Sequence, residues 1–179
     1  LGTIEPRKNV VGLIQAFHAL LARDSTIPDL VIAGRKGWLY QPVFQRIRDL
    51  GLESRVHLTD WIDQADAPAL LSAADMFVYP SLYEGFGLPP LEAMACGTPV
   101  ICSHAASLPE VVGDAAFLVD PKSVNEISAA IARVRDDAAL RERLSAQGIE
   151  RAAQFTWERA ARETLRVYER VGIKVQRDA

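Results

Sequence analysis

The sequence predicts an α/β domain in which helices cover both faces of a doubly wound parallel sheet. Up to Pro121, short apolar runs alternate in strict order with amphipathic stretches, and this alternation favours parallel strands joined by right-handed crossovers. The runs themselves are almost wholly apolar, as expected of strands that are buried on both faces. The 179 residues are enough for one domain with a sizeable core.

The apolar runs are the expected strands: Leu1–Ile4, Leu30–Ala33, Arg55–Leu58, Met76–Tyr79, Val100–Cys102 and Ala116–Val119. The amphipathic segments between them are the expected helices: Val10–Leu21, Pro42–Leu50, Ala67–Ala74 and Leu88–Ala95. Asn9 is expected to cap the first of these helices, and Gly51 to end the second. Pro68 lies in the first turn of the third helix, where a missing N–H group costs little.

After Pro121 the sequence becomes wholly helical, with expected helices at Val124–Arg135, Ala138–Gln147 and Trp157–Val171. These segments are rich in Ala, Arg and Glu, and neither an internal repeat nor a low-complexity linker interrupts the chain. We therefore expect one domain over residues 1–173, followed by a frayed polar tail at 174–179.

The charge balance argues against a polyanionic partner. Lys and Arg number 20 and Asp and Glu number 23, so the net charge is −3, and no basic block stands out along the chain. No apolar run approaches the roughly 18 residues of a membrane span. Nucleic-acid binding and membrane insertion are therefore not expected.

Cysteine and histidine are too sparse for a metal site or a disulfide framework. Cys96 and Cys102 are the only cysteines, and we interpret them as buried apolar residues of a protein from the reducing cytoplasm. His18, His57 and His104 are scattered, and we interpret them as ordinary polar residues. An Asp-x-Asp motif that could hold a bridging cation is also absent. No metal site and no cofactor are expected.

Candidate ligand-binding residues lie in the loops after the expected strands, because parallel sheets bind ligands at the carboxyl ends of their strands. The first such loop places Arg7 and Lys8 beside a helix N-terminus. Cations gain nothing from the helix dipole there unless an anion binds between them and the amides. The loop Gly34–Trp38 again combines glycine with cations, of which Arg35 suits phosphate or carboxylate. Solvated surface charge is the alternative interpretation of the first loop, and the second loop taken singly is a weak signal.

The most informative segment joins the fourth expected strand to the helix at Leu88. The amides of Phe86, Gly87 and Leu88 are expected to point into the crevice and, with the helix dipole, to bind an anion. Glu84 precedes these amides and Glu92 follows them, with seven residues between the two carboxylates. Carboxylates on either side of a phosphate site suit sugar hydroxyls. This order fits a ligand with a sugar, a diphosphate and a ribose.

The segment Glu84–Val100 resembles the Glu-x7-Glu signature of retaining GT-B glycosyltransferases of family 4, also called group 1. The likeness extends to the segments Glu5–Asn9, Val31–Gly34, Ala73–Asp75 and Leu108–Gly113. It covers nearly the whole chain, and the opening segment Gly2–Asn9 is similar to that of mannosyltransferase-like members. The resemblance implies the C-terminal, Rossmann-like, donor-binding domain of such an enzyme, without the N-terminal domain that binds the acceptor.

The resemblance also implies a role for each matching residue. Lys8 would contact the donor diphosphate and stabilise the leaving nucleoside diphosphate by electrostatics. Glu84 would hold hydroxyls of the donor sugar, and Glu92 would hold the ribose. The three amides before the helix would face the donor, within a turn that begins at Gly85. Lys8 and Glu84 are thus the expected catalytic residues.

One position departs from the family pattern, because Thr3 stands where many members have an arginine. Arg7 or Arg35 is expected to supply the second cation of the phosphate site instead. The loop Thr59–Ile62 resembles the segment that lies near the nucleobase. The complete set of expected donor-binding residues is Thr3, Arg7, Lys8, Arg35, Glu84, Gly85, Phe86, Gly87, Leu88 and Glu92.

The implied reaction is glycosyl transfer from a nucleotide sugar to an acceptor hydroxyl, with retention at the anomeric carbon and without a metal. GDP-mannose is the first choice of donor, and UDP-sugars are left open. Because the acceptor domain lies outside these 179 residues, the chain alone is expected to bind donor but to be inactive. The whole enzyme is expected in the cytoplasm, in polysaccharide biosynthesis, with peripheral membrane association through the missing half left open.

Other classes of function are weaker alternatives. A non-catalytic module that binds nucleotide sugars would need the same loop but no acceptor domain. A glycoside hydrolase would use Glu84 and Glu92 as its acid and nucleophile, but the phosphate-like loop between these carboxylates argues against it. A dehydrogenase is disfavoured because the three-glycine dinucleotide fingerprint is absent.

Overall fold

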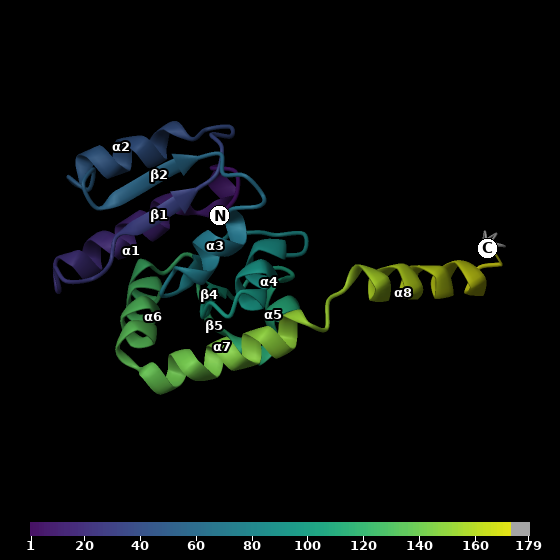
Figure 1. Cartoon of the computed structure of the whole chain (residues 1–179). Coiled ribbons are helices and arrows are strands. Elements are labelled where there is room, and N and C mark those ends of the chain that lie inside the picture. Colours follow the sequence, from purple (N-terminus) through teal and green to yellow (C-terminus); the bar gives the residue numbers. More distant parts are fainter. Residues whose placement is uncertain (173–179) are drawn as a thin grey trace.

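The computed structural model describes residues 1–172 and shows the predicted alternation of helices and strands (Figure 1). In chain order the elements are the 3-10 helix η1 (Pro6–Lys8), α1 (Val10–Leu21), β1 (Leu30–Ala33), α2 (Gln41–Asp49), β2 (Val56–Asp60), α3 (Ala67–Ser72), β3 (Phe77–Tyr79), α4 (Leu88–Ala95), β4 (Val100–Ser103), α5 (Leu108–Val112), the 3-10 helix η2 (Gly113–Ala115), β5 (Ala116–Val119), α6 (Val124–Asp136), α7 (Ala138–Ala152) and α8 (Trp157–Arg170). The tail predicted at 174–179 lies outside the described residues.

Every strand pair is parallel, as predicted, but the strands form two sheets instead of one. β1 pairs with β2, and Leu30 lies opposite Val56. β4 lies between β3 and β5, so Val100 lies opposite both Phe77 and Ala116. The α/β fold class is therefore confirmed, whereas the single continuous sheet is not found among the described strands.

The expected first strand, Leu1–Ile4, is not formed, so this prediction is wrong. Only an isolated parallel bridge joins Ile4 to Lys36. The segment does bond to the end of β1, since the Gly2 amide donates to the Ala33 carbonyl at 2.8 Å. Residues 1–4 lie mostly beyond Ala33, the last residue of β1, and the residues after Ala33 form a loop. A continuous ladder between the two segments is therefore not formed.

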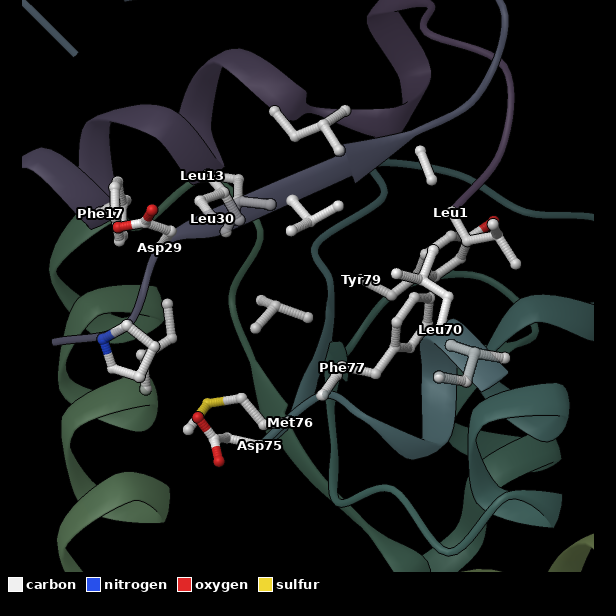
Figure 2. A pocket seen from close by; sticks show the side chains of 18 of the residues that line it. Leu1, Leu13, Phe17, Asp29, Leu30, Leu70, Asp75, Met76, Phe77 and Tyr79 are labelled. Atoms are coloured by element: carbon white, nitrogen blue, oxygen red, sulfur yellow. The ribbon is translucent and has the colours of Figure 1, made fainter. Parts of the chain in front are cut away.

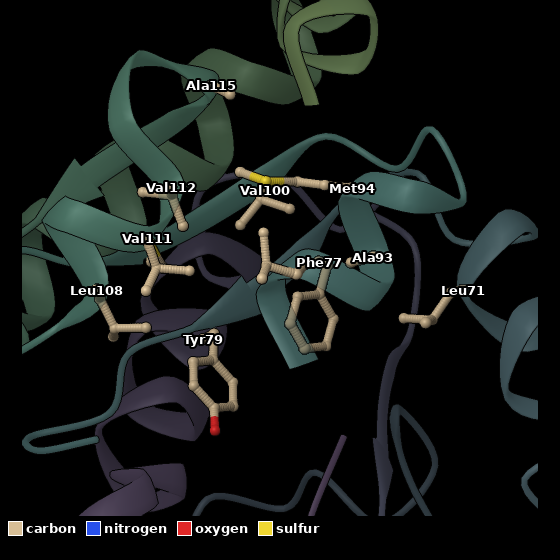
Figure 3. Packing of buried hydrophobic residues seen from close by; sticks show 12 residues of the cluster. Leu71, Phe77, Tyr79, Ala93, Met94, Val100, Leu108, Val111, Val112 and Ala115 are labelled. Carbon is tan, nitrogen blue, oxygen red and sulfur yellow. The ribbon is translucent and has the colours of Figure 1, made fainter. Parts of the chain in front are cut away.

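Helices cover both faces of the three-stranded sheet, as predicted. Phe77, Tyr79, Val100 and Cys102 pack in one cluster with α4 and α5 (Figure 3). Ile101 belongs instead to a cluster with α1, α6 and α7. Because alternate residues of a strand point to opposite faces, β4 is buried on both. Burial also raises the pKa of the Cys102 thiol to about 12, which agrees with the expected role as a buried apolar residue.

The predicted helix boundaries hold within two residues except for α7, which runs to Ala152, five residues beyond the predicted Gln147, and α4 begins and ends where predicted. α3 ends at Ser72, two residues early, and α5 was not predicted at all. Asn9 precedes α1 but its side chain does not cap it. Its backbone has a left-handed φ of 53°, a conformation that asparagine tolerates, and its Nδ2 donates to the Pro121 carbonyl at 2.6 Å.

The last helix stands apart from the rest of the fold. α8 projects away from the other elements (Figure 1), and none of its residues is buried. Across residues 1–172, no helix has the length and apolar character needed to cross a membrane.

Candidate functional site

Glu84 is the centre of a nearly buried ion cluster at the carboxyl end of β3. Its Oε1 accepts hydrogen bonds from Lys8 Nζ and from the Tyr79 hydroxyl, both at 2.8 Å. Its Oε2 accepts from Arg7 Nη1 at 2.6 Å, and the carboxylate side chain is only 8% exposed. The fold thus brings the predicted site residue Glu84 against two others, Arg7 and Lys8, which lie more than 70 positions before it in sequence.

The two cations of this cluster differ in how firmly they are held. Lys8 is 12% exposed, bonds to the Tyr79 hydroxyl as well as to Glu84, and lies 4.7 Å from the centre of the Tyr79 ring. Arg7 is 44% exposed and pairs with Glu5 at 2.6 Å in addition to Glu84. An ammonium has three N–H donors, so these contacts leave one donor of Lys8 for a ligand.

The contacts of Glu84 also determine which groups in the cluster are ionised. Burial alone would raise the pKa of Glu84, but hydrogen bonds from Lys8 and Tyr79 outweigh it and hold the pKa below its ordinary value of 4.5. Burial and the same carboxylate raise the pKa of Tyr79, so its hydroxyl stays a donor. At neutral pH the cluster therefore holds the Glu84 carboxylate between two cations, one of which, Arg7, also pairs with Glu5.

The lowered pKa of Glu84 makes its contribution to stability depend on pH. A carboxylate with a lower pKa in the folded state stabilises the fold above its unfolded pKa, and this contribution is lost as the pH falls through the folded pKa. The free-energy difference between the parent and Glu84→Gln should therefore be largest near neutral pH and shrink below pH 4.5. Urea unfolding across this range measures it. Glu92→Gln, at an exposed carboxylate, is the control, and a pH-independent difference for Glu84→Gln would contradict the expectation.

The loop after Glu84 leads into α4 as predicted, and two contacts fix its conformation. Gly87 precedes the helix with a φ of 111°, and a Cβ there would lie 2.6 Å from the Leu108 side chain. The Ser107 hydroxyl bonds to the Phe86 carbonyl at 2.9 Å and to the Glu84 carbonyl at 3.1 Å, which holds the loop in place.

Three N–H groups of this loop are available for a ligand. No backbone hydrogen bond within residues 1–172 uses the N–H groups of Phe86, Gly87 or Leu88. The next two residues, Pro89 and Pro90, have no N–H group. An anion bound at the start of this helix would therefore have to meet the amides before the prolines, and this role of Phe86, Gly87 and Leu88 stays a prediction.

A cavity of about 500 Å³ opens at the carboxyl ends of β1 and β2. Thr3, Arg35 and Glu92 line it, together with the exposed ring of Trp61. The Arg35 guanidinium lies 4.0 Å from the Trp61 ring centre, in a cation–π contact. The structure thus places these three predicted donor-binding residues on one cavity.

The cavity and the ion cluster are neighbours, joined by the opening segment of the chain. Gly2 lines the cavity, and a Cβ added there would lie 3.8 Å from Lys8 Nζ. Arg35 faces the cavity and stacks on Trp61, whereas Arg7 bonds to Glu84. Arg7 is therefore the second cation of the cluster, and Arg35 belongs to the cavity.

Residues 1–151 match the family described as "Glycosyl transferases group 1". This match covers most of the chain and includes the ion cluster, the loop before α4 and the cavity. The chain belongs to the group 1 glycosyl transferases.

This glycosyltransferase chain is similar to curated enzymes named for mannose transfer. It is 44% identical over 168 residues to "O-antigen chain mannosyltransferase B" of Escherichia coli, covering 94% of this chain and 44% of that protein. It is 41% identical over 175 residues to "MMP alpha-(1->4)-mannosyltransferase" of Mycolicibacterium hassiacum, covering 95% and 42%. The chain therefore spans less than half the length of the curated relatives it matches.

A solved structure confirms the fold class. Anabaena Alr3699/HepE in complex with UDP and glucose superposes with a TM-score of 0.81 at 26% identity, covering 94% of this chain and 47% of that one. The parallel strands flanked by helices are those of a GT-B glycosyltransferase.

The sequence alone did not single out several residues of the ion cluster and of the loop that follows it. Tyr79 is the last residue of an apolar strand, and its hydroxyl was not recognised as a partner of Glu84 and Lys8. Ser107 orders the loop from a helix that was not predicted. A tyrosine that ends an apolar strand just before the Glu84 loop was the available signal, whereas nothing local to Ser107 indicated its contact.

The site does not suit a glycoside hydrolase. A general acid needs a raised pKa, whereas Lys8 and Arg7 hold Glu84 in its ionised form. Glu92 lines the neighbouring cavity and is exposed.

The histidine prediction can be checked at one position. His57 forms a hydrogen bond with Asp29 at 2.6 Å, as an ordinary polar residue would.

Proposed function

We propose that this glycosyltransferase chain binds a nucleoside-diphosphate sugar, and that the whole protein transfers mannose from GDP-mannose to an acceptor hydroxyl with retention. The observation that carries the proposal is the pair of cations, Lys8 and Arg7, held around Glu84 beside the cavity that Glu92 lines. Neither cation needs a metal to meet a diphosphate, so we expect donor binding without one.

The geometry supports a specific placement of the donor. The diphosphate would meet the free donor of Lys8 and the open amides of Gly87 and Leu88. The nucleoside would occupy the 500 Å³ cavity, with its ribose at Glu92 and its base near Trp61. A carboxylate accepts about four hydrogen bonds, and Glu84 already accepts three. It would have room for about one sugar hydroxyl.

The chemistry of the transfer follows from this placement. The bond from the anomeric carbon to the diphosphate oxygen breaks, a bond from that carbon to the acceptor oxygen forms, and the proton of the acceptor hydroxyl passes to the leaving diphosphate. The negative charge that develops on the leaving diphosphate would be stabilised by Lys8, which is nearly buried and so acts in a low dielectric. Acceptor binding would fall to the part of the protein outside this chain, so the chain alone should not catalyse transfer.

The choice of mannose is supported by the two curated relatives named as mannosyltransferases. UDP-sugars are the second candidate, because the Anabaena relative is solved with UDP and glucose. The same site in a non-catalytic module would bind the donor equally well. Transfer activity of the whole protein would therefore separate an enzyme from such a module.

Calorimetric titration of the chain with GDP, UDP, GDP-mannose and UDP-glucose tests the donor proposal. Each titration is run with a chelator and again with added Mg²⁺. We expect GDP and GDP-mannose to bind, with affinities unchanged by the chelator. Selective binding of UDP and UDP-glucose would identify a UDP-sugar as the donor. If none of the four ligands bound, donor binding by this chain would be rejected.

Glu92→Gln tests where the ribose lies. Glutamine still accepts a hydrogen bond but without the charge, which removes roughly 1 kcal/mol, so the variant should bind GDP about fivefold more weakly. Inorganic pyrophosphate, which has no ribose, should bind the variant and the parent alike. Glu110→Gln, at an exposed carboxylate of α5, is the control. Equal loss for GDP and pyrophosphate would place Glu92 at the phosphates instead.

A further inference from the structure

The loop that leads into α4 is in contact with an aromatic ring from a distant part of the chain. The Phe86 ring meets the Phe155 ring edge to face, with 5.9 Å between the ring centres and 75° between the ring planes. Phe155 lies between α7 and α8. Gly85 and Gly87, on either side of Phe86, have no side chains, so the Phe86 ring is the part of this turn that a distant side chain can hold.

Phe155 is itself fixed by the carboxyl end of α7. Its N–H group donates to the Ala152 carbonyl at 3.0 Å, and the Arg151 guanidinium lies 4.9 Å from the centre of its ring, in a cation–π contact. Arg151 also donates to two carbonyls of α5, those of Val111 at 2.8 Å and Glu110 at 2.6 Å. The end of α7 is thus tied to α5 (Figure 1), so the Phe155 ring is attached to a well-anchored part of the chain.

A hydrogen bond from the start of α5 fixes the backbone of Phe86. The Ser107 hydroxyl donates to the Phe86 carbonyl at 2.9 Å. This carbonyl and the Gly87 N–H group belong to one trans peptide plane, in which the two groups point in opposite directions. The hydrogen bond therefore directs the Gly87 N–H away from Ser107, and no backbone acceptor within residues 1–172 takes that N–H.

The contact between the two rings adds little to the hydrophobic core. Phe86 is 44% exposed and Phe155 is 37% exposed, and neither belongs to the buried clusters that the described part of the chain forms. Truncating Phe155 should therefore leave the fold intact. The contact instead restricts the conformation of Phe86, because its ring and its carbonyl are both held.

We propose that Phe155 is a positioning residue for the donor diphosphate. It holds the Phe86 ring while Ser107 holds the Phe86 carbonyl, and the two contacts together set the direction of the Gly87 N–H group towards a phosphate oxygen. Fixing this N–H group before the donor arrives removes part of the conformational entropy that binding would otherwise cost. The inference rests on the proposed donor binding, in which Gly87 meets the diphosphate.

Titration of the parent chain and of Phe155→Ala with pyrophosphate, GDP and guanosine tests this role. Loss of an aromatic pair corresponds to roughly a two- to tenfold change, so we expect about fivefold weaker binding of pyrophosphate and GDP. Guanosine has no phosphate and should bind both chains alike. Phe155→Tyr keeps the ring and should restore the parent affinities. Trp157→Ala is the matched control, because it removes a neighbouring ring that is 81% exposed. An equal loss for guanosine would overturn the proposal.

A double-mutant cycle shows whether Phe155 acts through Phe86. In a Phe86→Ala background, Phe155→Ala should cause no further loss of pyrophosphate affinity, because the partner ring is already gone. Additive losses would mean that Phe155 acts elsewhere in the structure. Without any ligand, the NMR order parameter of the Gly87 N–H should fall from about 0.85 in the parent to below about 0.6 in Phe155→Ala.

The outcomes separate this inference from the proposed function. If the parent binds pyrophosphate and GDP and Phe155→Ala binds them equally well, the positioning role is overturned while donor binding stands. An unchanged order parameter at Gly87 would also overturn it, because Ser107 alone would then fix the peptide plane. If the parent binds neither pyrophosphate nor GDP, the proposed function fails, and the positioning role fails with it.

Discussion

Gly34→Ala is expected to destabilise the fold by at least about 3 kcal/mol. Gly34 has a φ of 150°, and a Cβ built there would lie only 1.9 Å from the Gly2 carbonyl oxygen. That oxygen belongs to backbone, so the clash cannot be relieved by rotating a side chain. Moving the Gly2 segment away would break its hydrogen bonds to Ala33 and Arg35.

Chemical denaturation of Gly34→Ala and of the parent measures this loss. Gly85→Ala is the matched control, because no atom lies within 4 Å of the position that its Cβ would take and its φ is not positive. The control should unfold within about 0.5 kcal/mol of the parent. If Gly34→Ala lost less than about 1 kcal/mol, the close approach of Gly2 to the end of β1 would not be a constraint on the fold.

Lys8→Ala is expected to weaken GDP binding by roughly 10- to 150-fold, the effect of losing a charge-assisted hydrogen bond worth roughly 1.5–3 kcal/mol. The variant removes the ammonium that would meet the diphosphate and leaves Glu84 bonded to Arg7 and Tyr79. The nearly buried carboxylate then has less positive charge around it, so it repels an incoming phosphate more strongly.

Titration with GDP, pyrophosphate and guanosine separates a phosphate role from a general loss of structure. Lys8→Ala should lose affinity for GDP and pyrophosphate but not for guanosine. Lys36→Ala is the control, because Lys36 is exposed and its ammonium lies over the rings of Tyr40 and Phe44. Equal losses of affinity for all three ligands would mean that Lys8 maintains the structure of the site and does not bind the diphosphate.

In the Glu84 loop, local sequence patterns predicted the backbone elements but not the contacts of Glu84. A buried strand, a turn with Gly87 and a helix beginning at Leu88 were all predicted and are all present. The two prolines after Leu88 and the open amides before them are also local features. What Glu84 does was harder to predict, because its partners Arg7 and Lys8 come from the opening of the chain.

Local sequence also could not decide which arginine lies beside Lys8. The sequence nominated both Arg7 and Arg35 as the second cation of the phosphate site, and both follow strands or strand-like segments. The structure places Arg7 on Glu84 and stacks Arg35 on Trp61 at the neighbouring cavity. This choice depends on how β1 and β3 are placed relative to each other, which no local pattern reports.

The sequence by itself determined the α/β class, the position of nearly every strand and helix, and the loops in which the site would lie. These follow from periodicity, apolar runs and turn residues, which act between neighbours along the chain. Only the tertiary structure decided that Tyr79 contacts Lys8 and Glu84, that Gly2 lies against Gly34, and that an apolar cavity lies between β1 and β3 (Figure 2). Each is a contact between segments distant in sequence, and its energy depends on distances that exist only once the strands are packed.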